Sequence, residues 1–359
     1  MRYIRALLKG IFCIFAILGF VTAVQLIRRT VRTQMTPSAE LSVSSQKVHP
    51  VVIIGSGSAG LAAAKTILEE DIPVVVLEGK QAGGALNIFT PVANWPGLST
   101  TSGTLILSDL RAEVAAHKEV RFIARSVDSF DFSGPIHILH LDNGETIQAQ
   151  TVVIAMGTRL RWLTVPGAQE YASFISYDQK PDSAQKSGTC VVIGGGVDAL
   201  RKAVFRLNAG ARVVLVVRGN RLGEGIVLKW FSLYGGKDRA KLLDDYSAQG
   251  KLTILFNSEV AEFIGDGSKL TGVRLSTGDI ISADCVAVGI GRVPNTELFK
   301  IQLDLDADGY IMLKNHSQQT SRPGVFAAGD ITSALYAEGA IAAGDGMKAA
   351  KDVMRYLVN

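Results

Sequence analysis

The feature that most constrains the fold of this chain is a repeated pattern in which an apolar strand enters a glycine-rich turn and then a helix-forming stretch. The first copy reads VVIIGSGSAGLAAAKTIL from residue 51, and the second reads CVVIGGGVDALRKAVFRL from residue 190. Each copy continues through a second strand and a meander to a closing strand that is followed by a glycine, Gly157 in the first half and Gly291 in the second. This alternation predicts an α/β fold with two doubly wound, Rossmann-like dinucleotide-binding domains in one chain.

The first glycine turn has the spacing Gly55-x-Gly57-x-x-Gly60. Gly55 permits the tight turn, Gly57 lets a pyrophosphate approach the backbone, and Gly60 lets the helix pack closely on the strand. The amides at the helix start then face the phosphates. The next strand ends on Glu78, the expected position for a carboxylate that accepts hydrogen bonds from a ribose. The alternative is a glycine turn that binds no ligand.

The second glycine turn, Gly194-x-Gly196-x-x-Ala199, follows the same logic with alanine at the packing position. Here the next strand ends on Arg218, and Arg221 follows three residues later. Guanidinium groups bind a 2′-phosphate, which a carboxylate would repel, so this turn favours NADPH over NADH. The alternative is that both arginines are solvated surface residues.

Charge is unevenly distributed along the 359 residues, whose formal net charge is +4. Residues 1–33 contain no acid and hold six basic residues: Arg2, Arg5, Lys9, Arg28, Arg29 and Arg32. The remainder is slightly negative, which argues against a body that binds nucleic acid.

Residues 11–27 form an uncharged apolar run between basic residues. As a helix this run would be roughly 25 Å long, close to the shortest span of a bilayer. We therefore expect residues 1–33 to be a single-pass membrane anchor and residues 34–47 to be a polar linker. A cleaved signal peptide is the alternative.

The three cysteines, Cys13, Cys190 and Cys285, show no spacing typical of a metal site or a redox motif. Cys190 and Cys285 each lie in an apolar strand, so we expect small buried hydrophobic residues there. No metal site and no oxidising compartment is predicted.

Several further segments resemble the thioredoxin-reductase-like flavoproteins over nearly all of residues 50–359. They are GGAL at 83–86, ANWPG at 93–97, VGIGRVPNTELF at 288–299, GVFAAGDI at 324–331 and EGAIAAGDGMKAA at 338–350. The resemblance implies FAD and NADPH as cofactors, a homodimer, and an FAD domain in two pieces, residues 48–165 and 291–359, around an NADPH domain at 166–290. It also implies further FAD-binding residues beside those of the first turn and Glu78: Gly84, Asn94, Gly157, Asp330, Gly339, Ala340 and Ile341. Gly291 is assigned to the NADPH site.

One departure from the family concerns the redox-active Cys-x-x-Cys, which thioredoxin reductases carry just ahead of the second glycine turn. Counting back from Gly194 places it on Tyr177, Asp178, Gln179 and Lys180. These side chains cannot accept two electrons as a disulfide does. No catalytic residue is therefore predicted. The segment also resembles that of thioredoxin-reductase-like ferredoxin–NADP reductases.

The sequence thus predicts an NAD(P)H-dependent FAD oxidoreductase that passes electrons to an external acceptor, a ferredoxin-like protein or a quinone. One alternative is a thioredoxin or disulfide reductase that uses a partner's cysteines. Another is a catalytically silent nucleotide-binding module. Because NADPH and FAD are cytoplasmic, the catalytic body is expected on the cytoplasmic side of the membrane.

Overall fold

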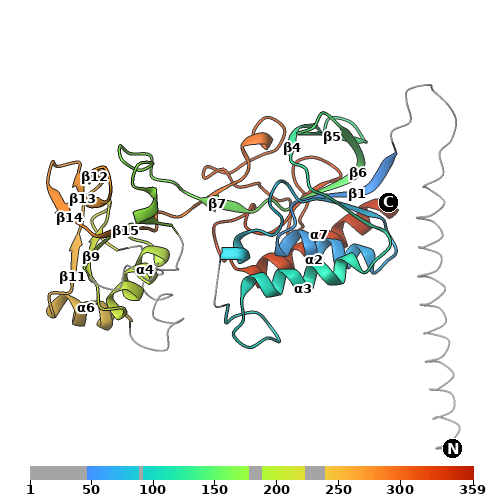
Figure 1. The fold of residues 1–359 in the computed structure, drawn as a ribbon. Helices are drawn as coiled ribbons and strands as arrows, with labels where there is room; N and C mark the ends of the chain where they lie inside the picture. Colours follow the sequence, from blue (N-terminus) through green and yellow to red (C-terminus); the bar gives the residue numbers. More distant parts are fainter. Residues whose placement is uncertain (1–46, 89–91, 178–187, 223–238) are drawn as a thin grey trace, which may run out of the picture. The chain divides into compact units, whose positions relative to one another are not determined.

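The computed structural model describes residues 47–88, 92–177, 188–222 and 239–359 (Figure 1). They form two compact units. Unit 1 contains the described residues up to Thr158 together with Pro294–Asn359, and unit 2 runs from Arg159 to Val293. The boundaries thus fall at 158/159 and 293/294, a few residues from those expected from the sequence, 165/166 and 290/291.

Within the described residues, unit 1 is built on a seven-stranded sheet with the order β3-β2-β1-β6-β5-β4, and β17 pairs with β6. Its strands are β1 (Val48–Ile54), β2 (Val74–Leu77), β3 (Val120–Ile123), β4 (Val127–Asp131), β5 (His137–Leu141), β6 (Thr146–Ile154) and β17 (Val325–Ala327). Strands β3, β2, β1, β6 and β17 pair in parallel, whereas β5 is antiparallel to both β4 and β6. The centre of β1 is fully buried, as expected for a parallel strand covered on both faces.

Three helices of unit 1 lie side by side in Figure 1, with α2 between its neighbours. They are α2 (Ser58–Leu68), α3 (Gly103–Ala115) and α7 (Gly339–Val358), and short 3₁₀ turns occur at η1 (Ala85–Ile88) and η4 (Glu297–Phe299). Helices α2 and α7 approach closely because Gly346 has no side chain: a Cβ there would lie 2.0 Å from the Ala59 carbonyl oxygen.

Unit 2 contains, among its described residues, a parallel five-stranded sheet in the order β11-β10-β9-β15-β8 and a smaller antiparallel sheet β12-β13-β14. The parallel strands are β8 (Ile175–Ser176), β9 (Thr189–Ile193), β10 (Arg212–Val216), β11 (Leu252–Leu255) and β15 (Cys285–Val288). The antiparallel strands are β12 (Val260–Gly265), β13 (Leu270–Leu275) and β14 (Ile280–Ser282), and the helical segments are η2 (Ala172–Phe174), α4 (Val197–Asn208) and α6 (Arg239–Ala248). Where the chain passes between the units, β7 (Thr158–Leu160) pairs with β16 (Arg292–Pro294). The predicted α/β dinucleotide-binding fold is confirmed.

In the described ranges, no helix combines the length and the apolar character needed to cross a membrane. The predicted anchor, residues 1–33, lies outside those ranges, and so does all but the last residue of the predicted linker, residues 34–47.

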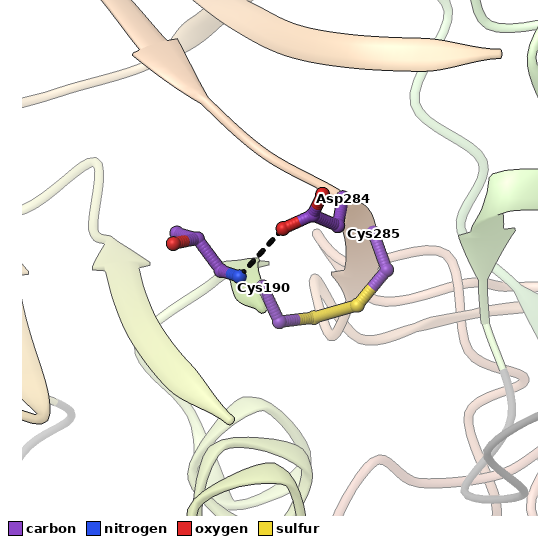
Figure 2. The surroundings of a disulfide bond; sticks show 4 residues. Cys190, Asp284 and Cys285 are labelled. Carbon is purple, nitrogen blue, oxygen red and sulfur yellow. Dashed lines mark hydrogen bonds between the residues drawn. A yellow bond between two sulfur atoms is a disulfide. The ribbon is translucent and has the colours of Figure 1, made fainter. Parts of the chain in front are cut away.

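Two of the cysteines form a disulfide bond, Cys190 to Cys285 (Figure 2). The two residues are direct partners in the parallel pairing of β9 with β15, and their Cα atoms are 4.8 Å apart. The expectation of small buried hydrophobic residues is confirmed for the burial of both cysteines, but it did not include the disulfide bond between them. The bond was missed because 95 residues separate the cysteines, and only the order and register of the strands bring them together. A signal was present, since each cysteine stands four residues before a glycine, in CVVIG and in CVAVG.

Candidate functional site

Four parallel strands of unit 1 end at the same edge of its sheet. Ile54 pairs with both Leu77 and Ile154, and Ile154 pairs with Ala327. The residues that follow these strand ends include four of the predicted FAD-binding positions: Gly55, Glu78, Gly157 and Asp330. In an open α/β sheet this carboxyl edge is where ligands bind. The register therefore brings the separated predictions together at one edge.

The first glycine turn requires glycine for steric reasons. Gly55 has φ +109°, and a Cβ there would lie 2.4 Å from the Ala155 carbonyl oxygen. A Cβ on Gly60 would lie 1.9 Å from the Gly55 carbonyl oxygen. Gly57 precedes helix α2, whose start has no side-chain cap, so the first amides of the helix are suited to bind a phosphate.

Glu78 presents a buried carboxylate at this edge. Its side chain is 6% exposed, and Oε2 accepts a hydrogen bond from Nη2 of Arg111 at 2.7 Å. The Arg111 guanidinium also lies 4.0 Å from the ring centre of Phe122. Oε1 of Glu78 is buried and has no hydrogen-bond partner among the described residues. Leaving such an oxygen unsatisfied costs about 1–3 kcal/mol, and a ribose hydroxyl would satisfy it. The site therefore fits the ribose of an adenine dinucleotide.

The predicted flavin-side residues also meet within unit 1. Asn94 donates a hydrogen bond through Nδ2 to Oε2 of Glu338, the residue that precedes α7. A Cβ on Gly339 would lie 2.8 Å from Leu86 of η1, so the GGAL loop contacts the start of α7. Ala340 and Ile341 belong to the first turn of this helix, and Ile341 is 43% exposed. The start of α7, which has no side-chain cap, is thus placed beside both predicted loops.

The remaining predicted FAD-binding residues lie in turns of the backbone. Gly84 has φ +140°, and Gly157 has φ +57° with open space where a Cβ would point. Gly329, just before Asp330, has φ +78° and approaches Ala59 of α2. Asp330 is half-buried at this turn.

Asn295 is a further residue at this edge that the sequence analysis did not single out. Its amide donates through Nδ2 to the Met156 carbonyl at 2.7 Å, and its backbone N–H donates to the Gly157 carbonyl at 3.1 Å. It therefore ties the chain that re-enters unit 1 to the end of β6. Its place within VGIGRVPNTELF was the available signal.

A second glycine turn closes the carboxyl edge of the sheet in unit 2. Ile193 at the end of β9 pairs with both Val216 and Val288, so three strands end together. Gly194 has φ +125°, and a Cβ there would lie 2.2 Å from the Gly289 carbonyl oxygen.

In contrast to Gly194, a Cβ on Gly196 would have no neighbouring heavy atom within 4 Å. Gly196 precedes α4, whose start has no side-chain cap.

Ala199 is fully buried, and a Cβ on Gly289 would lie 2.6 Å from the backbone nitrogen of Ala199. Gly289 is thus a packing glycine that the sequence analysis missed. Gly291 has φ +90°, and its carbonyl accepts the N–H of Arg161 at 3.1 Å.

The two arginines that favour NADPH lie on the surface just after β10. The Arg218 side chain is 87% exposed, and its Nε lies 3.8 Å from Oε1 of Glu259. Such an exposed ion pair contributes little, so it would not hold Arg218 away from a phosphate. Arg221 is also exposed.

Tyr177 is the described member of the four residues at the expected dithiol position; Asp178, Gln179 and Lys180 lie outside the described ranges. Its hydroxyl oxygen accepts the backbone N–H of Leu163 at 3.1 Å, and burial raises the pKa of the phenol. Its ring stands 4.2 Å from that of Trp162, which is 64% exposed. An aromatic pair therefore occupies this part of unit 2, and no thiol does.

The chain belongs to the pyridine nucleotide-disulphide oxidoreductase family, which it matches over residues 49–350. It is 33% identical to the thioredoxin reductase of Mycolicibacterium smegmatis, over 88% of this chain and 98% of that protein. It is also 33% identical to the bifunctional thioredoxin reductase/thioredoxin of Mycobacterium leprae, over 90% of this chain and 68% of that protein.

Among solved structures, thioredoxin reductase from T. acidophilum is 27% identical with a TM-score of 0.67, over 86% of this chain and 99% of that one. Thioredoxin reductase from Giardia duodenalis is 28% identical with a TM-score of 0.62, over 88% of this chain and all of that one. The predicted resemblance is confirmed. The chain is a thioredoxin-reductase-like, NAD(P)H-dependent flavin oxidoreductase, and the cofactors of its class are FAD and NADPH.

Proposed function

We propose that this protein uses NADPH to reduce the disulfide of a small redox protein. The relatives named thioredoxin reductases favour this alternative over the ferredoxin or quinone acceptor expected from the sequence. In the reaction, a hydride from NADPH and one proton from solvent convert the partner's disulfide into two thiols and leave NADP⁺. The observation that carries the NADPH-dependent part of the proposal is that both glycine turns are intact at the carboxyl edges of their sheets, and the named relatives support the disulfide as acceptor.

In this proposal, unit 1 binds FAD. Gly55, Gly57 and Gly60 shape the pyrophosphate turn, Glu78 binds the adenosine ribose, and Asp330 binds the ribityl chain. The loops at Gly84 and Asn94, the turn at Gly157, and the α7 start at Gly339, Ala340 and Ile341 surround the flavin. When bound, the flavin supplies two-electron transfer between nicotinamide and disulfide. The amides at the α7 start favour negative charge near them, which is the charge that a reduced flavin carries.

Unit 2 binds NADPH in this proposal. Gly194, Gly196 and Ala199 shape its pyrophosphate turn, Arg218 and Arg221 bind the 2′-phosphate, and Gly291 lies where the chain leaves the unit. The only disulfide of the described chain, Cys190 to Cys285, joins the opposite, amino ends of the strands. Electrons therefore pass to the partner's disulfide without an internal dithiol.

The arginine pair gives a cofactor-specific prediction. The double variant Arg218→Gln/Arg221→Gln is expected to raise the KM for NADPH by about tenfold or more, because two charge-assisted contacts to the 2′-phosphate are lost. The KM for NADH is expected to change little, since NADH has no such phosphate. Rates of flavin reduction measured with both nucleotides check this, and an equal loss with both would refute the assignment.

The acceptor is tested with the purified full chain carrying FAD. NADPH is added without oxygen, and flavin absorbance is followed while oxidised thioredoxin, ferredoxin or a soluble quinone is supplied. Bleaching followed by reoxidation with the thioredoxin disulfide supports the proposal. Reoxidation with ferredoxin or quinone alone would restore the acceptor expected from the sequence. A flavin that never bleaches would indicate a silent nucleotide-binding module.

We also propose that residues 1–33 form a single-pass membrane anchor and that the catalytic body lies on the cytoplasmic side. A homodimer, which the family resemblance implies, is proposed as the assembly. The uncharged run 11–27 between basic residues supports the anchor. Membrane fractionation of the full chain and of a chain that starts at residue 48 tests it. Equal recovery of both in the soluble fraction would contradict the anchor, and sedimentation of the shorter chain tests the dimer.

A further inference from the structure

We propose that the Cys190–Cys285 disulfide is a redox-dependent cross-link of the NADPH-binding unit. In this proposal it takes no electrons during turnover, and its oxidation state sets how stably unit 2 holds its nucleotide-binding edge. The proposal concerns the fold of unit 2 and does not depend on which acceptor the enzyme reduces.

The amino ends of β9 and β15 hold the two cysteines in place before any covalent bond is considered. Cys190 and Cys285 face each other as partners in the parallel pairing. The neighbouring residues add two hydrogen bonds, both at 2.8 Å: the backbone N–H of Asp284 donates to the Thr189 carbonyl, and the Thr189 N–H donates to Oδ2 of Asp284. The bond that the Asp284 carboxylate accepts is the dashed line in Figure 2. These contacts keep the sulfurs together in the reduced state, so the bond can form and break reversibly.

The cross-link lies at the opposite end of these strands from the nucleotide turn. Gly194 lies four residues after Cys190 along extended chain, at a distance of about 13 Å. This distance and the burial of both cysteines separate the sulfurs from a nucleotide bound at the turn. Yet the same two strands carry both features, because Gly194 contacts Gly289 directly at the carboxyl end. Anything that loosens the β9–β15 pair therefore loosens the nucleotide edge.

The loop closed by the bond spans 95 residues, a large part of unit 2. It includes α4, β10, α6, β11 and the antiparallel sheet. Cross-links that close long loops restrict the unfolded chain most strongly. A bond at this position is therefore expected to stabilise the whole unit against unfolding.

In this proposal the cross-link forms and breaks by thiol–disulfide exchange with a small molecule. The only other cysteine of the chain is Cys13, so the catalytic body has no third thiol with which to exchange. A small-molecule disulfide oxidises the two cysteine thiols: a bond forms between the sulfurs of Cys190 and Cys285, and the small molecule is released as two thiols. A small dithiol reverses the exchange and leaves as a disulfide. Because Cys190 is 0% and Cys285 3% exposed, attack requires opening of the strand ends, and the exchange is slow.

The test compares oxidised and reduced full-length protein carrying FAD, in a Cys13→Ala background that removes the unrelated thiol. Oxidised glutathione prepares one state and dithiothreitol the other, and peptide mapping after alkylation verifies each. Reduction is expected to lower the melting temperature of unit 2 by about 5–15 °C. Hydrogen exchange is expected to speed up in β9 and β15 and to stay unchanged in β1. The KM for NADPH is expected to rise several-fold near the melting temperature.

The matched control is Cys190→Ala/Cys285→Ala in the same background. It lacks the bond in both reagents, so its melting temperature must not respond to dithiothreitol, and it supplies the unlinked state if the native bond resists reduction. Equal melting temperatures of the linked and unlinked proteins would overturn the proposal. So would full alkylation of both cysteines after treatment with oxidised glutathione.

Discussion

Replacing Gly60 by alanine is expected to lower the amount of bound FAD by about tenfold or more. The added Cβ would lie 1.9 Å from the Gly55 carbonyl oxygen and 3.4 Å from the Ala155 Cβ, so α2 has to move away from the strand ends. Alanine favours helix over glycine by about 1 kcal/mol, but overpacking against the backbone costs about 1–3 kcal/mol or more. The steric effect is the larger one, and it disrupts the turn that holds the pyrophosphate.

The measurement is the ratio of bound FAD to protein after purification, together with the melting temperature. A fall of about tenfold or more in bound FAD is expected for Gly60→Ala. Gly134→Ala is the matched control in the same unit, because its Cβ would lie 3.7 Å from the Ile136 carbonyl oxygen, an ordinary contact. Normal FAD content in Gly60→Ala would show that the turn does not need a glycine at this position.

Replacing Gly196 by valine is expected to block NADPH while leaving the protein folded. Gly196 has φ −89° and ψ 179°, an extended conformation that valine adopts readily, and no atom lies within 4 Å of the Cβ position. Loss of glycine ahead of α4 costs about 1 kcal/mol or less. The side chain fills the space through which a pyrophosphate approaches the helix amides, so the KM for NADPH is expected to rise about a hundredfold.

Flavin reduction by NADPH, measured by stopped flow, checks this second expectation, and dithionite serves as a reductant that needs no nucleotide site. Gly196→Val should bleach normally with dithionite and melt within about 5 °C of the unsubstituted protein. Gly194→Ala is the contrasting variant, because φ +125° and the 2.2 Å approach to the Gly289 carbonyl oxygen make glycine necessary for folding there. It should lose stability as well as NADPH binding. Normal NADPH kinetics in Gly196→Val would refute the placement of the pyrophosphate.

The two experiments separate glycines that the fold requires from those that the ligand requires. All these positions look alike in the sequence, because GxGxxG and GxGxxA record spacing only. The structure distinguishes them by what a Cβ would meet: backbone atoms at Gly55, Gly60 and Gly194, and open space at Gly196.

The sequence by itself determined the two dinucleotide turns, the strands that lead into them and the repeated plan of the chain. These features depend on local chemistry, since a buried strand, a turn with positive φ and an uncapped helix start are encoded within about twenty neighbouring residues. The absence of a Cys-x-x-Cys before Gly194 is likewise a fact of the sequence.

Only the tertiary structure decided which distant residues meet. It paired Glu78 with Arg111, left the other Glu78 carboxylate oxygen without a partner among the described residues, and tied Asn295 to the end of β6. It also joined Cys190 to Cys285 across 95 residues, whereas the apolar strands around them predict only that both cysteines are buried. The physical reason is the same in each case. Contacts between neighbouring strands depend on strand order and register, which arise from packing the whole sheet and are not written in any one segment.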